Sequence, residues 1–433
     1  MYVDVIGAGL AGCEAAWALA ERGFSVRLYE MKPKKRTPAH RYDGLAELVC
    51  SNSLKAARVG SAAGMLKAEM RMLGSLILEA ADRTSVPAGG ALAVNREQFS
   101  DYITEKICSH PNITLISEEV AEFPEKNTVI ATGPLTSEGM TAAIKERCGD
   151  TLSFYDAAAP IVTFESIDMS RAFFATRYDK GDADYINCPM NKEEYQRFYE
   201  ALVTAETVPL KEFEDLTVYE GCMPVEVLAK RGAESVRYGC MKPVGLTDPN
   251  TGHRPWAAVQ LRKENTEGSL YNIVGFQTNL KFPEQKRVFG LIPGLENAEF
   301  ARYGVMHRNT FLNSPLLLDH RFMLKGSENV FFAGQMTGVE GYTESAMSGI
   351  IAGISLAKRL LGESELVLPD TTMCGALCRH VSTENKDFQP MGANMGMLPP
   401  LAENIRNKQE RYEAIAQRGL SDLKRCALLI SDL

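Results

Sequence analysis

The sequence predicts an α/β fold in which a parallel-sheet domain, discontinuous along the chain, carries an inserted α+β domain. Three observations support this prediction: a βαβ pattern at the start of the chain, a strand–loop–helix pattern beyond residue 320, and alternating apolar runs between them. The chain has 433 residues, more than a single hydrophobic core usually serves, so two domains are expected. We expect the first domain to comprise 1–165 and 316–433, and the inserted domain 166–315.

The composition is that of an ordinary globular protein, with 45% hydrophobic and 24% charged residues. The net charge of −8 argues against a generally basic nucleic-acid coat, although it leaves room for a local basic patch. No apolar run approaches the roughly 18 residues that a membrane span needs, and the strand-like opening MYVDVIGAGLAG lacks the pattern of a signal peptide. The ten cysteines are scattered, which is typical of reduced thiols, so we expect a cytoplasmic protein without a membrane partner.

A metal site is not expected. The closest pair of cysteines, Cys374 and Cys378 with the neighbouring His380, offers too few ligands at zinc-finger spacing.

The first 35 residues are predicted to form a βαβ unit. VDVIG and FSVRLYE are the strands, and the helix runs from Ala11 to Arg22. In the GAGLAG turn between them, the first glycine permits the tight bend, the second lets backbone approach a pyrophosphate, and the third packs helix against strand. An acid at the end of the second strand can accept a hydrogen bond from a ribose hydroxyl, which favours FAD or NAD over NADP. We therefore predict that a dinucleotide is held by Glu30 and by the turn residues Gly7, Ala8, Gly9, Leu10, Ala11 and Gly12.

Two later segments favour FAD. NTVIATGP (127–134) is a short β run ending in Ala-Thr-Gly, which resembles a segment of FAD-dependent two-dinucleotide-binding proteins. ENVFFAGQMTGVEGYTESAMSGIIAG (328–353) gives a strand, a glycine-punctuated loop and a helix, whose N-terminal dipole can stabilise a reduced, anionic isoalloxazine. A second GxGxxG, which a dedicated NAD domain would need, is absent from the sequence. A Rossmann-like FAD-binding domain is therefore predicted, with further cofactor contacts from Thr132, Gly133, Gly334, Gln335, Tyr342 and Thr343.

The middle of the chain is predicted to fold as α+β. PIVTFESI, WAAVQLRKEN and YNIVGFQTNL alternate between apolar and polar residues, as strands do, whereas NKEEYQRFYEALVTAE has helical spacing.

Six longer strings are more distinctive than the nucleotide fingerprint: GAGLAGCEAAWALAERG, LVCSNSLKA, YEGCMPVEVLAKRG, YGCMKPVGL, FAGQMTGVEGYTESAMSGI and FQPMGANMGMLPPL. Through these strings, which extend from residue 3 to about 401, the chain resembles the folate- and FAD-dependent tRNA (uracil-5-)-methyltransferase family. The resemblance implies C5-methylation of a uridine in the T-loop of tRNA, with 5,10-methylenetetrahydrofolate as carbon donor. It also implies reduced FAD as methylene carrier and hydride source, and NADH or NADPH as reductant.

The resemblance assigns the chemistry to two cysteines. Uracil C5 is a poor nucleophile, but a thiolate that adds at C6 gives C5 carbanion character. The family motif places this thiolate at Cys222, and Pro224 is expected in the first turn of the following helix, VEVLAKRG, where the pKa of a nearby thiol falls. Cys50, in VCSNSL, is implied to lie beside the flavin, as proton-abstracting base or as protector of a flavin–methylene adduct. The division of labour between the two thiols stays open.

Further residues are expected to contact the folate, the flavin and the RNA. The resemblance implies that His307 stacks on the folate pterin, and Ser51, Asn52 and Ser53 are expected to hydrogen-bond the flavin. Basic side chains near the two cysteines are expected to contact RNA, in an interface where phosphates dominate affinity; these are Lys55, Arg58, Lys230 and Arg231.

Three alternatives follow from the same residues. Relatives within the family methylate ribosomal RNA by the same chemistry. A larger FAD-dependent modifier of the tRNA wobble uridine has a related fold but would call for a longer chain with a helical C-terminal domain. An NAD(P)H-dependent flavin oxidoreductase without an RNA substrate would leave Cys222 dispensable. The sequence makes no prediction of the oligomeric state.

Overall fold

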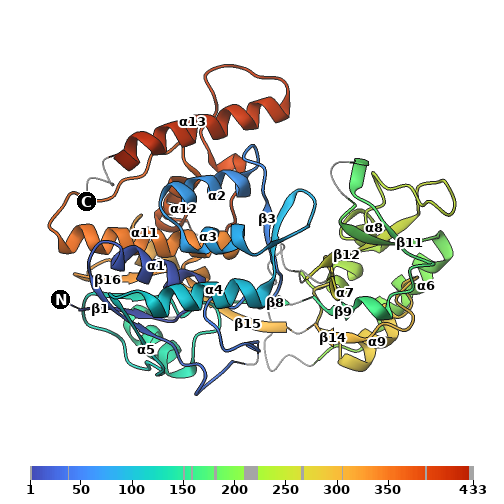
Figure 1. Cartoon of the computed structure of the whole chain (residues 1–433), viewed down its shortest axis with the longest axis horizontal. Helices are drawn as coiled ribbons and strands as arrows, with labels where there is room; N and C mark the ends of the chain where they lie inside the picture. Colours follow the sequence, from blue (N-terminus) through green and yellow to red (C-terminus); the bar gives the residue numbers. More distant parts are fainter. Residues whose placement is uncertain are drawn as a thin grey trace.

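The computed structural model describes residues 2–37, 39–149, 152–157, 159–179, 183–208, 223–264, 268–304, 306–385 and 388–428. They form two lobes that lie side by side (Figure 1). The hydrophobic core of the first lobe combines residues from both ends of the chain, from Val3 to Ile144 and from Leu312 to Leu423. The core of the second lobe is built from the middle of the chain, between Val162 and Ala298.

The first lobe is built on a five-stranded sheet in which every pairing is parallel. A parallel sheet is usually covered by helices on both of its faces, so its strands are rich in apolar residues. The order across the sheet is β16 (Val330–Phe332), β7 (Thr128–Ile130), β1 (Tyr2–Ile6), β2 (Ser25–Tyr29) and β6 (Ile113–Ile116). Because β16 pairs with β7, sequence from beyond residue 320 completes the sheet, as the discontinuous fold requires.

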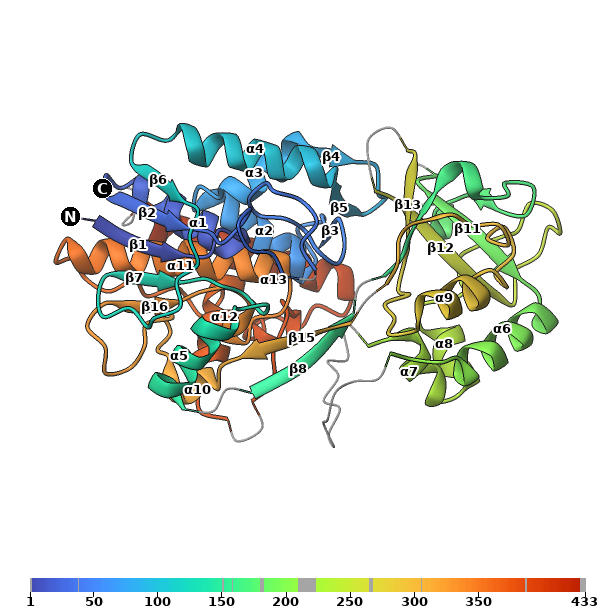
Figure 2. The same cartoon turned by 90° about the horizontal axis from the view of Figure 1, so that it is seen from below.

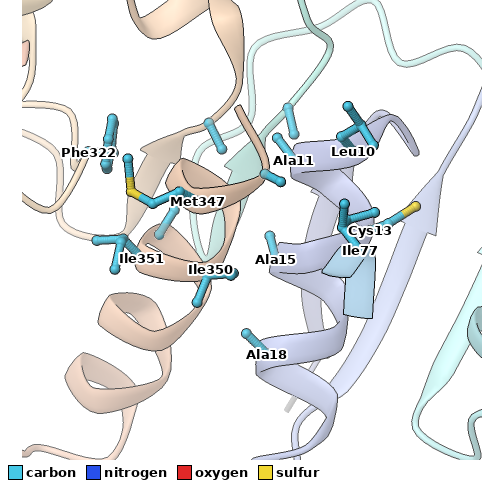
Figure 3. Packing of buried hydrophobic residues seen from close by; sticks show 14 of the residues in the cluster. Leu10, Ala11, Cys13, Ala15, Ala18, Ile77, Phe322, Met347, Ile350 and Ile351 are labelled. Atoms are coloured by element: carbon cyan, nitrogen blue, oxygen red, sulfur yellow. The ribbon is translucent and has the colours of Figure 1, made fainter. Parts of the chain in front are cut away.

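Helices α1 (Leu10–Ala20) and α11 (Tyr342–Leu360) come from opposite ends of the sequence and pack closely together. Small residues permit this approach: a Cβ atom on Gly349 would lie 2.1 Å from the carbonyl oxygen of Ala11. Figure 3 shows Ala11, Ala15 and Ala18 of α1 facing α11, whose Met347 and Ile351 point away from α1, on the side of Phe322. The glycine- and alanine-rich run 346–357 is thus part of a packed helix. Among the described residues no helix is both long and apolar enough to cross a membrane.

Further helices surround this centre. They are α2 (Ala62–Met72), α3 (Leu76–Arg83), α4 (Arg96–Ser109), α5 (Glu138–Cys148), α10 (Ser314–Leu317), α12 (Met373–Ser382) and α13 (Lys408–Leu428). Short 3₁₀ turns occur at Gln335–Thr337 and Met395–Met397. An antiparallel sheet of β3 (Ser53–Ala56), β5 (Ala91–Val94) and β4 (Ser85–Val86) completes the lobe.

The second lobe is an antiparallel six-stranded sheet with helices, which is the α+β arrangement expected from its alternating runs. The order is β10 (Phe173–Phe174), β11 (Tyr185–Met190), β12 (Ala257–Lys263), β13 (Leu270–Ile273), β9 (Ile161–Thr163) and β14 (Phe300–Arg302). Its helices are α6 (Lys192–Thr204), α7 (Val225–Lys230), α8 (Ala233–Tyr238) and α9 (Phe282–Phe289), with 3₁₀ turns at Phe164–Ser166 and Arg177–Asp179. Helix α6 begins with a capping box between Asn191 and Glu194.

Two antiparallel strands, β8 (Leu152–Ala157) and β15 (Met306–Phe311), lie toward the junction of the lobes in both views (Figure 2). They carry the chain out of the first lobe and back into it. Strand β9 precedes the expected boundary at 165/166, yet it pairs within the second sheet. The division into 1–165, 166–315 and 316–433 stays a prediction.

Replacing Gly349 by alanine is expected to destabilise the protein by about 1–3 kcal/mol, because the added methyl group meets backbone that cannot rotate away. Gly353→Ala should cost less, since its Cβ would lie 2.8 Å from the Ala15 carbonyl oxygen. Urea unfolding of the FAD-loaded protein measures both. Leu361→Ala, at a side chain that is half exposed, is the control and should change little; a Gly349→Ala midpoint equal to wild type would contradict the close helix contact.

Candidate active site

A groove crosses the carboxyl ends of the parallel strands, where open α/β sheets usually bind their ligands. It encloses about 1030 Å³ of empty space, part of which is open to solvent. Its walls come from the β1–α1 turn, the end of β2, the loops after β7 and β16, and the first turn of α11. Most of the predicted cofactor residues line it: Gly7, Gly9, Leu10, Ala11, Glu30, Thr132, Gly133, Gly334, Gln335 and Tyr342.

The remaining three predicted cofactor residues lie beneath this surface. Ala8 is buried, and its backbone N–H donates to the Glu30 carboxylate at 3.0 Å. Gly12 has a packing role, since a Cβ atom there would lie 1.7 Å from the Gly7 carbonyl oxygen. Thr343 is buried and its hydroxyl donates to Glu344 at 2.8 Å, so Tyr342 and Ser345 form the groove wall at this point.

The β1–α1 turn has the geometry that its glycines predicted. Gly7 adopts φ +98°, and a Cβ atom there would lie 2.6 Å from the carbonyl oxygen of Ala131. Gly9 has open space where a side chain would begin, so a ligand can approach its backbone. The turn thus leaves an uncovered backbone surface at the N-terminus of α1, which suits an anionic pyrophosphate.

Glu30 is fixed at the end of β2. Its two carboxylate oxygens accept hydrogen bonds from the backbone N–H groups of Ala8 and Lys32, both at 3.0 Å. Because the carboxylate also lines the groove, it is placed to accept from a ribose hydroxyl. The glycine turn, the acid and the second glycine-bordered loop at Gly334 together fit an FAD molecule along the groove.

An ion pair between the half-exposed Lys55 and the buried Glu344 stabilises the first turn of α11. Gly341, at φ +125°, precedes the helix, and the carboxylate of Glu344 accepts from Lys55 at 2.8 Å and from the Ala393 backbone at 2.9 Å. Burial alone would raise the pKa of Glu344, but the Lys55 charge and these hydrogen bonds outweigh it and leave the pKa lowered. Lys55 therefore has a structural partner, and its contact with RNA stays a prediction.

Cys50 lies beside the groove and contacts Tyr342 from the distant end of the chain. The Tyr342 hydroxyl lies 2.9 Å from the Cys50 sulfur, and it accepts from the backbone N–H groups of Cys50 at 2.8 Å and Ser51 at 3.1 Å. Since the Tyr342 side chain also lines the groove, the same residue connects the predicted flavin site to this thiol.

Three arginines that no sequence signal predicted bind the Cys50 segment, residues 48–52. Arg96 donates to the carbonyl oxygen of Leu48 at 2.8 Å, and Arg302 donates to that of Val49. Arg262 donates to Ser51 Oγ at 2.7 Å and to the Asn52 side chain at 3.1 Å. No sequence motif joins these arginines, because they are contributed by α4, β12 and β14.

Asn52 and Ser51 have a role other than the predicted contact with the flavin. The fully buried Asn52 amide donates to the carbonyl oxygens of Val94 at 3.1 Å and of Lys263 at 2.9 Å, and Ser51 accepts from Arg262. The expectation that the Asn52 side chain contacts the flavin is therefore wrong. Its polarity satisfies backbone groups where the two lobes meet.

The second predicted catalytic residue, Cys222, lies outside the described residues. Helix α7 begins at Val225, so Pro224 is its N-cap residue and does not stand in the first turn as expected. Lys230 and Arg231 are exposed at the end of this helix, and Arg58 is exposed before α2. His307 pairs in register with Asp156 across β15 and β8, and its side chain lies outside the described part.

The described residues contain no group of three or more histidine, cysteine or acidic side chains that could hold a metal. Cys374 and Cys378 are buried in α12, and His380 contacts the Gln389 carbonyl oxygen at 2.9 Å.

The fold and groove define a dinucleotide-binding protein with a Rossmann-like FAD-binding domain. Comparison with family models matches residues 2–364 to the family described as glucose inhibited division protein A, GIDA. The solved structure of Aquifex aeolicus GidA in its form II crystal superposes with a TM-score of 0.71 at 17% identity, covering 98% of this chain and 73% of that chain. This likeness supports the fold alone.

Relatives of similar length identify the family of this chain more closely. A protein of Heliobacterium modesticaldum is 59% identical over 428 residues, and one of Bacillus subtilis is 58% identical over 424 residues. A protein of Halalkalibacterium halodurans is 57% identical over 425 residues. Each match covers 98% of both chains, and each relative is named methylenetetrahydrofolate–tRNA-(uracil-5-)-methyltransferase TrmFO. The chain belongs to the folate- and FAD-dependent tRNA (uracil-5-)-methyltransferase family, within the wider GIDA family, which confirms the resemblance read from its motifs.

Glu30→Gln is expected to weaken FAD binding about 10- to 100-fold, because the substitution removes a charged hydrogen-bond acceptor from the groove. Fluorescence titration of the apoprotein with FAD measures the change. Glu105→Gln, at an exposed position on α4, is the matched control. Equal affinities of wild type and Glu30→Gln would contradict the assignment of Glu30 to the ribose.

Proposed function

We propose that this protein methylates C5 of a uridine in the T-loop of tRNA, with 5,10-methylenetetrahydrofolate as carbon donor and FAD as cofactor. The observation that carries this proposal is the identity of 57–59%, over 98% of both chains, to relatives whose names state the tRNA, the folate and the methylated position. The groove and the thiol beside it supply a site of the matching chemistry.

The cofactor groove holds FAD through the β1–α1 turn, Glu30 and the loops around Thr132 and Gly334. Reduced FAD supplies the methylene carrier and the hydride that completes the methyl group. NADH or NADPH is the reductant, and the reaction takes place in the cytoplasm.

Cys222 is the nucleophile that adds to uracil C6, which turns the ring into an enolate with electron density at C5. The described residues Val208 and Val225, on either side of Cys222 in the sequence, are bonded within the second lobe. The Val208 N–H donates to the Asn279 carbonyl oxygen at 2.9 Å, and the Val225 N–H donates to that of Gln277 at 2.7 Å.

Cys50 takes the complementary role from the first lobe. Once C5 has accepted its new carbon, its proton must leave, and a thiolate at Cys50 can accept it. The uridine has to leave its stack to reach between the two thiols, as bases do in other enzymes that act on a single base.

Folate and RNA are held by side chains around this centre. His307 stacks on the pterin of the folate. Lys230 and Arg231, at the exposed end of α7, contact phosphates, and Lys55 and Arg58 do so beside Cys50.

Incubation of the FAD-loaded protein with methylenetetrahydrofolate, NADH or NADPH, and unmodified tRNA is expected to give 5-methyluridine, measured by nucleoside mass analysis. Cys222→Ala and Cys50→Ala should each lower its formation by at least about 100-fold, because each removes a group that bonds to the ring or takes its proton. Both variants should keep their flavin absorbance.

Cys108→Ala is the matched control, since that thiol is exposed on α4 and should leave the rate unchanged. Ribosomal RNA is the competing substrate in a parallel reaction. Methylation of ribosomal RNA but not tRNA would replace the proposed substrate, and full activity of Cys222→Ala would remove its role as nucleophile.

A further inference from the structure

Tyr342 stands between the cofactor groove and Cys50. Its side chain lines the groove, and its hydroxyl group contacts the Cys50 segment at three atoms. We infer that Tyr342 is a positioning residue that donates its phenolic hydrogen to the Cys50 sulfur and so holds that sulfur as a hydrogen-bond acceptor facing the site. The inference rests on the proposed function for the role of Cys50 as a base.

The direction of this hydrogen bond follows from the other two contacts. A phenolic oxygen carries one hydrogen and a limited acceptor capacity. The backbone N–H groups of Cys50 and Ser51 both donate to this oxygen, at 2.8 Å and 3.1 Å, and occupy that capacity. The hydrogen that remains is the one on Tyr342 itself, and the Cys50 sulfur lies 2.9 Å from the oxygen. Tyr342 is therefore the donor and the sulfur the acceptor.

Tyr342 is able to keep this role throughout the physiological pH range. Burial, followed by the proximity of Cys50, raises the pKa of Tyr342 well above that of an exposed tyrosine, so its hydrogen is retained. A hydrogen bond donated to a charged group favours the charged form, which for a thiol is the thiolate.

The charged groups that face Cys50 act in the same direction. Arg96 from α4, Arg262 from β12 and Arg302 from β14 interact electrostatically with the thiol. Glu264, which Arg96 binds at 2.8 Å, offsets part of the charge of these arginines. Guanidinium groups close to a partly buried thiol stabilise its thiolate form.

This arrangement prepares Cys50 for the step proposed for it. The C5–H bond of the uracil breaks, its electron pair stays on the ring, and the proton forms an S–H bond on Cys50. The hydrogen bond from Tyr342 favours the thiolate, which is the form of the sulfur that can take up this proton. The two backbone N–H bonds to the same oxygen fix the loop, so the sulfur keeps one orientation relative to the groove.

The test is the pH dependence of Cys50 alkylation by iodoacetamide in the FAD-loaded protein, followed on the Cys50 peptide by mass spectrometry. In Tyr342→Phe the ring stays but the donor is lost, so the midpoint of the alkylation profile should rise by about one to two pH units. The kcat for 5-methyluridine formation should fall, while KM for tRNA stays within about twofold, since the phenol acts on proton transfer rather than on binding.

Tyr199→Phe is the matched control, because it likewise removes one hydroxyl group from a part-buried tyrosine. This hydroxyl donates to the carbonyl oxygen of Ala229 at 3.2 Å, and the ring packs against the core of the second lobe. The alkylation midpoint of this variant should equal that of wild type. A Tyr342→Phe midpoint equal to wild type would overturn the inference.

A second substitution covers a Tyr342→Phe protein that fails to fold or to hold FAD. Difluorotyrosine at position 342 keeps nearly the size of the tyrosine side chain and makes its hydroxyl group a stronger hydrogen-bond donor. The pH midpoint of Cys50 alkylation should therefore fall. An unchanged or higher midpoint overturns the inference. Alkylation needs neither folate nor tRNA, so this result is independent of whether 5-methyluridine is formed.

Discussion

The close contact of α1 with α11 is the constraint on which the site depends. The Gly349 backbone approaches the Ala11 carbonyl group so closely that no side chain fits between them. This contact joins the two ends of the sequence into one sheet-and-helix core and brings the start of α11 to the edge of the cofactor groove. Tyr342, the first residue of α11, consequently reaches Cys50, which is 292 positions away in the sequence. A looser helix pair would separate the groove from its thiol.

The second constraint is the junction between the lobes. Arg262 and Arg302 of the second lobe, with Asn52 of the first, connect the two lobes through the backbone around Cys50. The position of this thiol therefore depends on both lobes at once.

The parts of the structure that depend on local sequence could be predicted. The GAGLAG turn requires a positive φ, which is found at Gly7, and close backbone approaches, which are found at Gly7 and Gly12. The strand–loop–helix after residue 328 showed the discontinuous fold, since β16 needs the parallel neighbour β7. The family was found from whole strings of residues, whereas the nucleotide fingerprint alone would have given a flavoprotein.

What could not be predicted depends on long-range packing. Arg96, Arg262 and Arg302 lie on separate elements and share no spacing, so only the fold brings them to Cys50. Asn52 was expected to face the flavin because a polar residue beside a cofactor suggests binding, but backbone carbonyl groups at the lobe junction use its amide. Lys55 was expected to attract phosphate, and its pairing with the buried Glu344 depends on α11, far along the chain.

The central claim is that the thiols of Cys50 and Cys222 face the same uridine, and a short thiol-bridging reagent such as dibromobimane tests it most directly. In the FAD-loaded protein the reagent should join the two cysteines into one cross-linked peptide pair, and bound tRNA should suppress that product. If each thiol reacts separately with a monofunctional reagent but the bridge never forms, with or without folate, the two cysteines do not share a site.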